Sequence, residues 1–256
     1  MQRRDLLRLL STVVLAGCGR DTATPPEPPT EPGPDAGATA ELDPTVTPEP
    51  DSTVAAGVTV DLLCRDAWRA RPAGDGMAEH TITQITVHHP AAAATARTDG
   101  PAHFRSYQAF HQDDRGWADI AYHVGIDRTG HVFMLRPWDR AGDTGTEYDP
   151  ATHFLVLVDG NFDEHEPSAA QLETAARVIA WASGHFAVGL DTVGGHRDHA
   201  STSCPGEALY TRLPEVVARA TELTRDGVQL REVCGDEAAA IVAAIEDGTA
   251  PDAVTH

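Results

Sequence analysis

The segment 194–210, GGHRDHASTSCPGEALY, places a cysteine shortly after a histidine-rich turn. Cys204 lies eight residues after His196, between Ser203 and a Pro-Gly pair, just before an expected helix. A cysteine in such a position is usually half of a disulfide, a metal ligand or a nucleophile. The loop between His196 and Cys204 could fold back on itself and bring an imidazole and a thiol together.

His88 is a third candidate ligand, at the end of the segment TITQITVHH (residues 81–89), whose β-branched residues predict a strand. Three nitrogen and sulfur ligands with one open position are typical of a catalytic zinc, whereas a structural zinc has four protein ligands. Zinc requires neutral imidazoles and a thiolate, and it lowers the pKa of bound water towards neutrality. The set His88, His196 and Cys204 is therefore a candidate zinc site.

Two other interpretations stay open on spacing alone, because the chain has 13 histidines. His196 and Cys204 could simply pack in a structural protein that binds no metal. Alternatively, His196 and Asp198 match the His-x-Asp half of a facial triad that binds non-haem iron, although this leaves Cys204 without a role. Metal analysis distinguishes the three, since they predict zinc, no metal and iron.

The first eighteen residues have the features of an export signal. Arg3 and Arg4 precede the apolar segment LLRLLSTVVLAG, which is too short to span a membrane. That segment ends at Cys18 in LAGC, which resembles a bacterial lipobox, where the cysteine after the cleavage site receives lipid. We expect residues 1–18 to be a lipoprotein-type signal peptide and the protein to be exported and lipid-anchored to the cell envelope, facing the periplasm or the wall. The alternative is an ordinary signal peptide with an unrelated cysteine.

Residues 19–57 are rich in proline, threonine and acids and contain no aromatic residue. Such a segment cannot bury enough apolar surface to fold, so we expect a disordered linker. The formal net charge of the chain is −20, and a protein this acidic is repelled by nucleic-acid phosphates, which excludes nucleic-acid binding. The remainder is divided into a folded domain over residues 58–225 and a helical extension over residues 226–256.

Cys64 and Cys234 lie near the two ends of the folded part. In an oxidising, exported compartment they are natural partners for a disulfide that clamps the domain, with two free buried thiols as the alternative. If they pair, Cys204 is left without a cysteine partner, which favours a chemical role for it.

Strand and helix patterns alternate along the domain. The expected elements are a strand at 81–89, a helix at 102–113, a hairpin at 121–135, a strand at 153–158, a helix at 167–184 and a helix after Cys204. Ser168 and Gln171 form a capping box at the start of the 167–184 helix, and Gly184 is expected to end it. This order predicts an α/β fold, a single domain with a central mixed β-sheet flanked by helices.

Four motifs, in order, resemble the peptidoglycan recognition proteins and the related zinc-dependent N-acetylmuramoyl-L-alanine amidases. They are RDAWRARP at 65–72, VHHP at 87–90, FHQDDRGWADIAYHVGIDRTGHVF at 110–133 and GGHRDHASTSCPGEALY at 194–210. The resemblance covers nearly the whole expected domain. It implies hydrolysis of the amide bond between N-acetylmuramic acid and the L-alanine of peptidoglycan, with Zn2+ as the cofactor.

The resemblance also implies roles for individual residues. His88, His196 and Cys204 match the zinc ligands, Tyr122 matches a tyrosine beside the metal, and Thr202 occupies a position where relatives carry threonine or lysine. We expect Tyr122 to donate a hydrogen bond to the oxyanion that forms on the scissile carbonyl, and Thr202 to add a second. No residue is identified as a general base.

A substrate groove is expected to include Trp138 and His89. Pro137 replaces a glycine common in the family, and residues 139–153, DRAGDTGTEYDPATH, lack its Gly-Ala-His sequence, so stem-peptide specificity is not predicted. The expected partners are peptidoglycan and, through the lipid, a membrane, and we expect a monomer. The alternative function is a non-catalytic peptidoglycan-binding lipoprotein of the same fold. Some relatives have lost the cysteine, but this chain keeps all three ligand positions.

Overall fold

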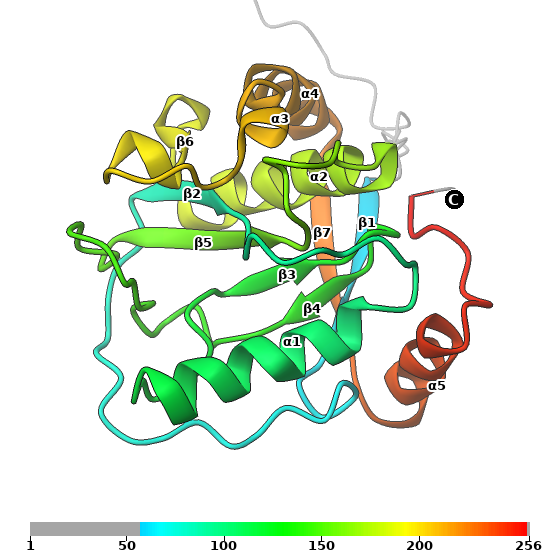
Figure 1. Cartoon of the computed structure of the whole chain (residues 1–256). Helices are drawn as coiled ribbons and strands as arrows, with labels where there is room; N and C mark the ends of the chain where they lie inside the picture. Colours follow the sequence, from blue (N-terminus) through cyan, green and yellow to red (C-terminus); the bar gives the residue numbers. More distant parts are fainter. Residues whose placement is uncertain (1–56, 255–256) are drawn as a thin grey trace, which may run out of the picture. The chain divides into compact units, whose positions relative to one another are not determined.

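The computed structural model describes residues 57–254, which form a seven-stranded sheet with helices on both faces (Figure 1). Predictions for residues 1–56, including lipidation of Cys18, lie outside the described residues. The strands are β1 (Val58–Leu63), β2 (Gln84–His88), β3 (Val124–Ile126), β4 (Val132–Met134), β5 (His153–Val158), β6 (Val193–Gly195) and β7 (Val228–Val233). The α-helices are α1 (Gly100–Ala109), α2 (Ala169–Phe186), α3 (Glu207–Tyr210), α4 (Leu213–Asp226) and α5 (Gly235–Glu246).

The strand order is β6-β2-β5-β3-β4-β1-β7, and only the β3–β4 hairpin is antiparallel among the pairs of this sheet. All six residues of β5 are buried, as expected for a central strand covered on both faces. The predicted α/β fold with a mixed central sheet is confirmed. Among the described residues, no helix has the length and apolar character needed to cross a membrane.

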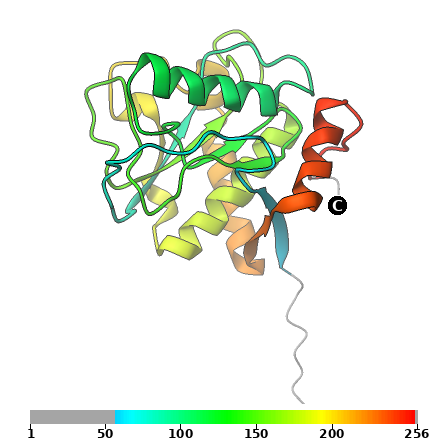
Figure 2. The ribbon, with the colours of Figure 1, turned by 90° about the horizontal axis from the view of Figure 1, so that it is seen from below.

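Two hydrophobic clusters lie on the opposite faces of the sheet. One includes α2 and α4, whose apolar side chains pack on β2, β3 and β5. The other includes α1 and α5, which lie side by side in Figures 1 and 2. Gly125 in β3 permits this packing, because a Cβ there would lie 2.6 Å from the Phe104 ring of α1. The sheet is therefore held rigidly between two helical layers.

Helix α2 begins as the sequence predicts and ends later. The Ser168 hydroxyl accepts from the Gln171 backbone N–H at 3.0 Å, and the Gln171 side chain accepts from the Ser168 N–H at 3.0 Å. The expected end at Gly184 is wrong, because Gly184 remains helical and Ala187 adopts the left-handed conformation, with φ 54°. An alanine in this position is unusual, since the left-handed region favours glycine.

The segment 226–256 supplies a strand as well as the expected helix. Strand β7 pairs in parallel with β1 along its whole length. Its sequence, VQLREV, has no continuous apolar run, and among its residues only Val233 is buried. The Arg231 guanidinium also binds both oxygens of Asp61 in β1, at 2.7 and 2.8 Å. This edge strand therefore depends on its neighbour, which is why its own hydrophobic pattern does not reveal it.

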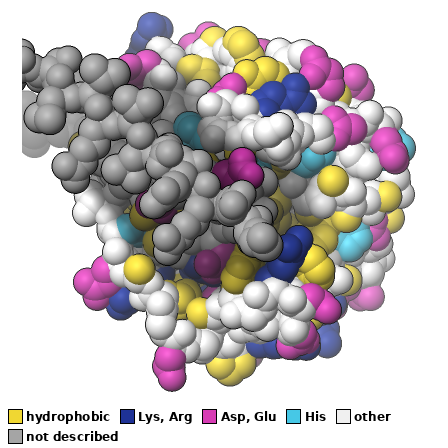
Figure 3. Space-filling model, turned by 60° about the vertical axis from the view of Figure 1, so that its left-hand side comes forward, with side chains coloured by type: hydrophobic (Ala, Val, Ile, Leu, Met, Phe, Trp, Pro, Cys, Tyr) yellow, Lys and Arg dark blue, Asp and Glu magenta, His cyan; other side chains and the backbone are white. Residues whose placement is uncertain are grey.

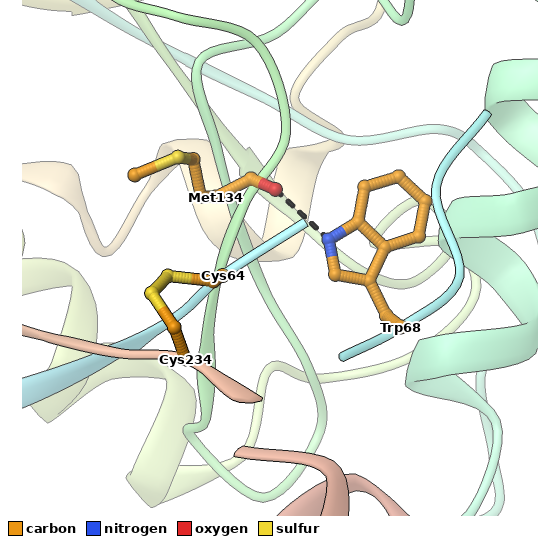
Figure 4. Close-up of a disulfide and its surroundings, with 4 residues drawn as sticks. All are labelled: Cys64, Trp68, Met134 and Cys234. Atoms are coloured by element: carbon orange, nitrogen blue, oxygen red, sulfur yellow. Dashed lines mark hydrogen bonds between the residues drawn. A yellow bond between two sulfur atoms is a disulfide. The ribbon is translucent and has the colours of Figure 1, made fainter. Parts of the chain in front are cut away.

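A disulfide joins Cys64 and Cys234, the pair singled out in the sequence (Figure 4). Cys64 directly follows β1, and Cys234 follows β7 and precedes α5, so the bond links the ends of two parallel neighbours. Nearby, the Trp68 indole N–H donates to the Met134 carbonyl at 2.9 Å (Figure 4). The disulfide thus links the end of the edge strand β7, and the start of α5, to the end of β1.

His123 is completely buried as a neutral imidazole. Its Nδ1 accepts from the Leu155 N–H at 2.8 Å, and its Nε2 lies 2.9 Å from the Arg140 carbonyl, to which it donates. Burial, the largest cause, lowers the pKa of His123 to about 3. Because the unfolded chain has a His pKa near 6.5, it binds more protons than the folded chain between these two values, and stability falls as the pH falls.

We expect the free energy of unfolding to drop by about 2 kcal/mol through His123 alone between pH 7 and pH 5. A His123→Gln variant keeps a donor and an acceptor but does not titrate. Between pH 7 and pH 5 the free energy of unfolding of this variant, measured by urea unfolding, should fall by about 2 kcal/mol less than that of the unchanged protein. Equal losses in the two proteins would contradict the assignment. Because the stability of each protein at pH 5 is compared with its own stability at pH 7, any effect of the substitution that does not depend on pH cancels.

Candidate metal centre

His88 and His196 meet because they follow paired positions of neighbouring strands. Val87 in β2 pairs with Gly195 in β6, and the two histidines are the next residues along these parallel strands. Their ring centroids lie 4.7 Å apart. Both side chains are buried, so the sheet register presents two imidazoles at one edge.

Cys204 reaches the same point through a loop that folds back. The Arg197 N–H donates to the Cys204 carbonyl at 2.8 Å, which closes the loop. Gly195 allows the close approach, because a Cβ there would lie 2.7 Å from Pro205 Cδ. The Cys204 Sγ lies 3.7 Å from His88 Nδ1, and one ligand atom from each of His88, His196 and Cys204 lies within 4.8 Å of the others. The structure therefore brings together the three residues that the sequence selected.

Burial keeps the two imidazoles neutral and the thiol protonated when no metal is bound. It lowers the pKa of His88 well below its ordinary value, with His196 adding to the effect, and lowers the pKa of His196 to about 4. Burial also raises the pKa of the Cys204 thiol to about 12, although the His89 backbone N–H, 3.4 Å from the sulfur, opposes this. Binding of a cation would release the thiol proton and give two neutral nitrogens and one thiolate.

This donor set fits zinc. Imidazole nitrogen and thiolate sulfur are the ligands that zinc prefers, and three of them leave a fourth position for water or substrate. The His-x-Asp alternative is not favoured, because the Asp198 carboxylate is already used by the loop. Its oxygens accept from the Gly195 N–H at 2.7 Å and from the Tyr210 hydroxyl at 2.6 Å. Asp198 also belongs to neither of the two groups of possible metal ligands found among the described residues.

Tyr122 and Thr202 both lie at this centre. The Tyr122 ring is 5.1 Å from the His88 ring, at an interplanar angle of 53°. Burial, followed by the nearby Cys204, raises the pKa of the Tyr122 phenol, so it stays protonated at neutral pH. The Thr202 hydroxyl oxygen accepts from the Cys204 N–H at 3.2 Å, which leaves the hydroxyl proton available to donate.

His89 and Trp138, the two residues expected in a substrate groove, have the following contacts in the structure. His89 is buried, and its Nδ1 accepts from the Phe162 N–H at 3.2 Å, so its side chain holds a loop. Burial lowers the pKa of His89 to about 4. Trp138 packs edge-on against Trp181 and His185 of α2, at 5.4 and 6.0 Å between ring centroids. The His89 side chain is thus buried, whereas Trp138 stays half-buried, and their part in a substrate groove stays a prediction.

Two further residues contact the candidate ligands and were not selected from the sequence. They belong to the loop of residues 141–152, which leads into β5. The Thr146 hydroxyl lies 2.7 Å from His196 Nε2, and the Tyr148 hydroxyl lies 3.4 Å from His88 Nε2. A single threonine and tyrosine in an acidic loop follow no periodic pattern, so one sequence offers no signal for them. They face histidines that lie 50 and 60 residues away in the chain.

A family model described as N-acetylmuramoyl-L-alanine amidase matches residues 78–207, which include all three candidate ligands. The chain belongs to this amidase family. Peptidoglycan recognition protein 1 of Mus musculus is 31% identical over 153 residues, which cover 58% of this chain and 84% of the mouse protein. The N-acetylmuramoyl-L-alanine amidase of Homo sapiens is 34% identical over 136 residues, covering 50% of this chain but only 23% of the human protein.

Solved structures of this amidase and recognition-protein group share the fold. One is the complex of tracheal cytotoxin with the ectodomains of peptidoglycan recognition proteins LCa and LCx. It aligns with 61% of this chain and 96% of its own, with a TM-score of 0.56 and 25% identity. The likeness to peptidoglycan recognition proteins thus extends from sequence to three-dimensional structure.

Proposed function

We propose that this protein is a zinc-dependent N-acetylmuramoyl-L-alanine amidase, which hydrolyses the amide bond between N-acetylmuramic acid and L-alanine in peptidoglycan. The observation that carries the proposal is the meeting of two imidazoles and one thiol, all buried, at one edge of the sheet. Membership of the amidase family and the name of the human relative support the same reaction.

His88, His196 and Cys204 would hold the zinc ion. When bound, zinc supplies Lewis acidity, which polarises a carbonyl oxygen and lowers the pKa of bound water. The three residues contribute one negative charge, on the thiolate, so the centre keeps a net positive charge to act on the substrate. Their burial lowers the local dielectric and strengthens that effect.

Tyr122 would stabilise the negative charge that develops on the scissile carbonyl oxygen. Its raised pKa keeps the phenol protonated at neutral pH, so it acts as a hydrogen-bond donor and not as a base. A donor fixed in place before the reaction lowers the barrier because it needs no reorganisation. Thr202, held beside Cys204 by its own hydrogen bond, would offer a second donor.

Peptidoglycan binding without cleavage is the second candidate function. It is favoured by the neighbouring recognition-protein structure, which is a complex with tracheal cytotoxin. Tracheal cytotoxin is itself a monomeric diaminopimelic acid-type peptidoglycan. The two candidates differ in one outcome, since only the amidase releases product.

The deciding experiment is digestion of purified peptidoglycan by the protein, with and without a zinc chelator, followed by mass spectrometry of the soluble products. An amidase releases stem peptides that begin with L-alanine and leaves intact glycan strands, and the chelator stops the release. Sedimentation of the protein with peptidoglycan, without any released peptide from the zinc-loaded sample, would establish binding alone. Release of disaccharides would contradict both candidates, because it requires cleavage of the glycan.

A further inference from the structure

The loop of residues 141–152 places one hydroxyl on the outer nitrogen of each candidate histidine ligand. A neutral imidazole has one nitrogen that can bind a metal and one N–H that needs an acceptor. The hydroxyls of Thr146 and Tyr148 can serve as those acceptors.

The contacts decide which nitrogen of each ring faces the metal. In His88, Nδ1 lies 3.7 Å from Cys204 Sγ, whereas Nε2 lies 3.4 Å from the Tyr148 hydroxyl. In His196, Nε2 lies 2.7 Å from Thr146 Oγ1, which leaves Nδ1 for the metal. Both rings thus have the same orientation, with Nδ1 inward and Nε2–H donating to a hydroxyl of the loop.

The Thr146 hydroxyl is oriented to accept a hydrogen bond from His196 Nε2–H. Its hydroxyl lies 2.8 Å from Thr144 Oγ1, to which it can donate, so its lone pairs face the His196 N–H. The Thr146 backbone N–H also donates to Thr144 Oγ1, at 3.1 Å. A chain of hydrogen bonds therefore runs from His196 through Thr146 to Thr144.

Tyr148 is fixed by packing of its ring. The ring lies 4.9 Å from His196 and 5.7 Å, nearly parallel, from His199, and it meets His153 edge-on at 5.1 Å. His153 is in turn held by a 2.7 Å contact between its Nδ1 and the Thr86 hydroxyl. The phenol therefore reaches His88 from a ring that three histidines hold in place.

The start of the loop is fixed to the core. The Arg136 side chain, only 1% exposed, donates to the Ala141 carbonyl and to the Asp143 carboxylate, the latter at 2.5 Å. A Cβ on Gly142 would lie 2.3 Å from Leu155 Cδ1, so the loop leaves the core by a path that only glycine permits. These contacts let the loop carry its two hydroxyls in a defined position.

We propose that Thr146 and Tyr148 are positioning residues of the metal centre, which hold the two imidazoles with Nδ1 towards the metal and so raise its affinity. The proposal rests on the proposed function, because it assumes that His88, His196 and Cys204 bind zinc. Partners of this kind orient metal-binding histidines in other proteins, and their loss reduces metal affinity by about 10- to 100-fold. Neither residue needs to touch substrate for this role.

The test is the zinc dissociation constant of the full chain, measured by competition with a chromophoric chelator at fixed pH. Thr146→Val removes the hydroxyl at nearly constant volume and should weaken zinc binding by about 10- to 100-fold. Tyr148→Phe, whose lost contact is longer, should weaken it by about 3- to 10-fold. Thr146→Ser should restore the affinity to that of the unchanged protein, because serine retains the acceptor.

Tyr122→Phe is the matched control, since it removes a phenol at the same centre without removing an acceptor from either histidine. It should leave the zinc dissociation constant unchanged. The melting temperatures of the metal-free variants identify any general loss of folding, and Tyr148→Phe still tests the proposal if Thr146→Val unfolds.

The outcomes separate this proposal from the proposed function. If the unchanged protein binds no zinc, the proposed function fails first. If it binds zinc and cleaves peptidoglycan, but Thr146→Val and Tyr148→Phe bind zinc as tightly, the positioning role is wrong. Equal weakening by Tyr122→Phe and Tyr148→Phe would also overturn it, since the effect would then not depend on contact with a ligand.

Discussion

Cys204→Ala should abolish both zinc binding and cleavage of peptidoglycan. The substitution leaves two neutral nitrogen donors and removes the only ligand that becomes negatively charged. Because Lewis acidity from the metal is worth several kcal/mol, we expect the cleavage rate to fall by at least about 1000-fold. Released stem peptides, quantified by mass spectrometry, give the rate.

Ser203→Ala is the control for this loop. Ser203 is exposed, and its hydroxyl donates to the Asp163 carboxylate at 2.8 Å, away from the ligand atoms. Its loss should change the rate by less than about threefold, as expected for an exposed side chain. Substantial cleavage by Cys204→Ala, or an equal loss in both variants, would contradict the assignment of Cys204 as a ligand.

Tyr122→Phe should reduce kcat by about 100- to 1000-fold while the zinc content stays the same. The phenol is expected to donate to the oxygen that becomes negatively charged only in the transition state, so its loss should affect kcat more than KM. Phenylalanine retains the ring that packs on His88 and His111, so the local packing is preserved. Steady-state kinetics on a soluble muropeptide, together with metal analysis, give both quantities.

A rise in KM with unchanged kcat would contradict this role, because it would mean that Tyr122 only binds the substrate in its ground state. Loss of zinc from Tyr122→Phe would also contradict it. Tyr122 would then be a residue that positions the metal ligands, which is the role proposed for Tyr148.

The elements with strong local patterns were predictable from the sequence. Strand β5 is buried on both faces and therefore reads as a continuous apolar run, and α2 shows its capping box at Ser168. Strand β7 was missed because its apolar and polar residues alternate only from Val228 to Arg231, and Glu232 breaks the pattern, so the signal for an edge strand is short and weak. The end of α2 was misplaced because glycine is tolerated within a helix at Gly184, while Ala187 takes the left-handed position.

The candidate site likewise contains residues that the sequence predicted and residues that it did not. The resemblance to the amidase family selected His88, His196 and Cys204 because each lies in a motif of several residues, and the sheet register then brings them together. Thr146 and Tyr148 lie in the loop of residues 141–152, outside the four motifs, so no motif pointed to them.

The expected place of Trp138 in a substrate groove stays a prediction. Its half-buried indole packs against aromatic side chains of α2. Sequence cannot distinguish a groove from a packed surface here, because both favour tryptophan.

The described surface carries charges of both signs. On the face drawn in Figure 3, acidic and basic side chains are interspersed, with histidine side chains visible among them. The expectation that the chain does not bind polyphosphates rests on the net charge of −20 and stays a prediction.

The most direct test of the metal centre is elemental analysis of the full chain, purified in buffers without added metal or chelator. We expect one zinc ion for each chain, and loss of that zinc in Cys204→Ala. Iron in place of zinc would instead support an oxygenase-type site. A protein that contains no metal, and takes up none when zinc is supplied in excess, would contradict the account.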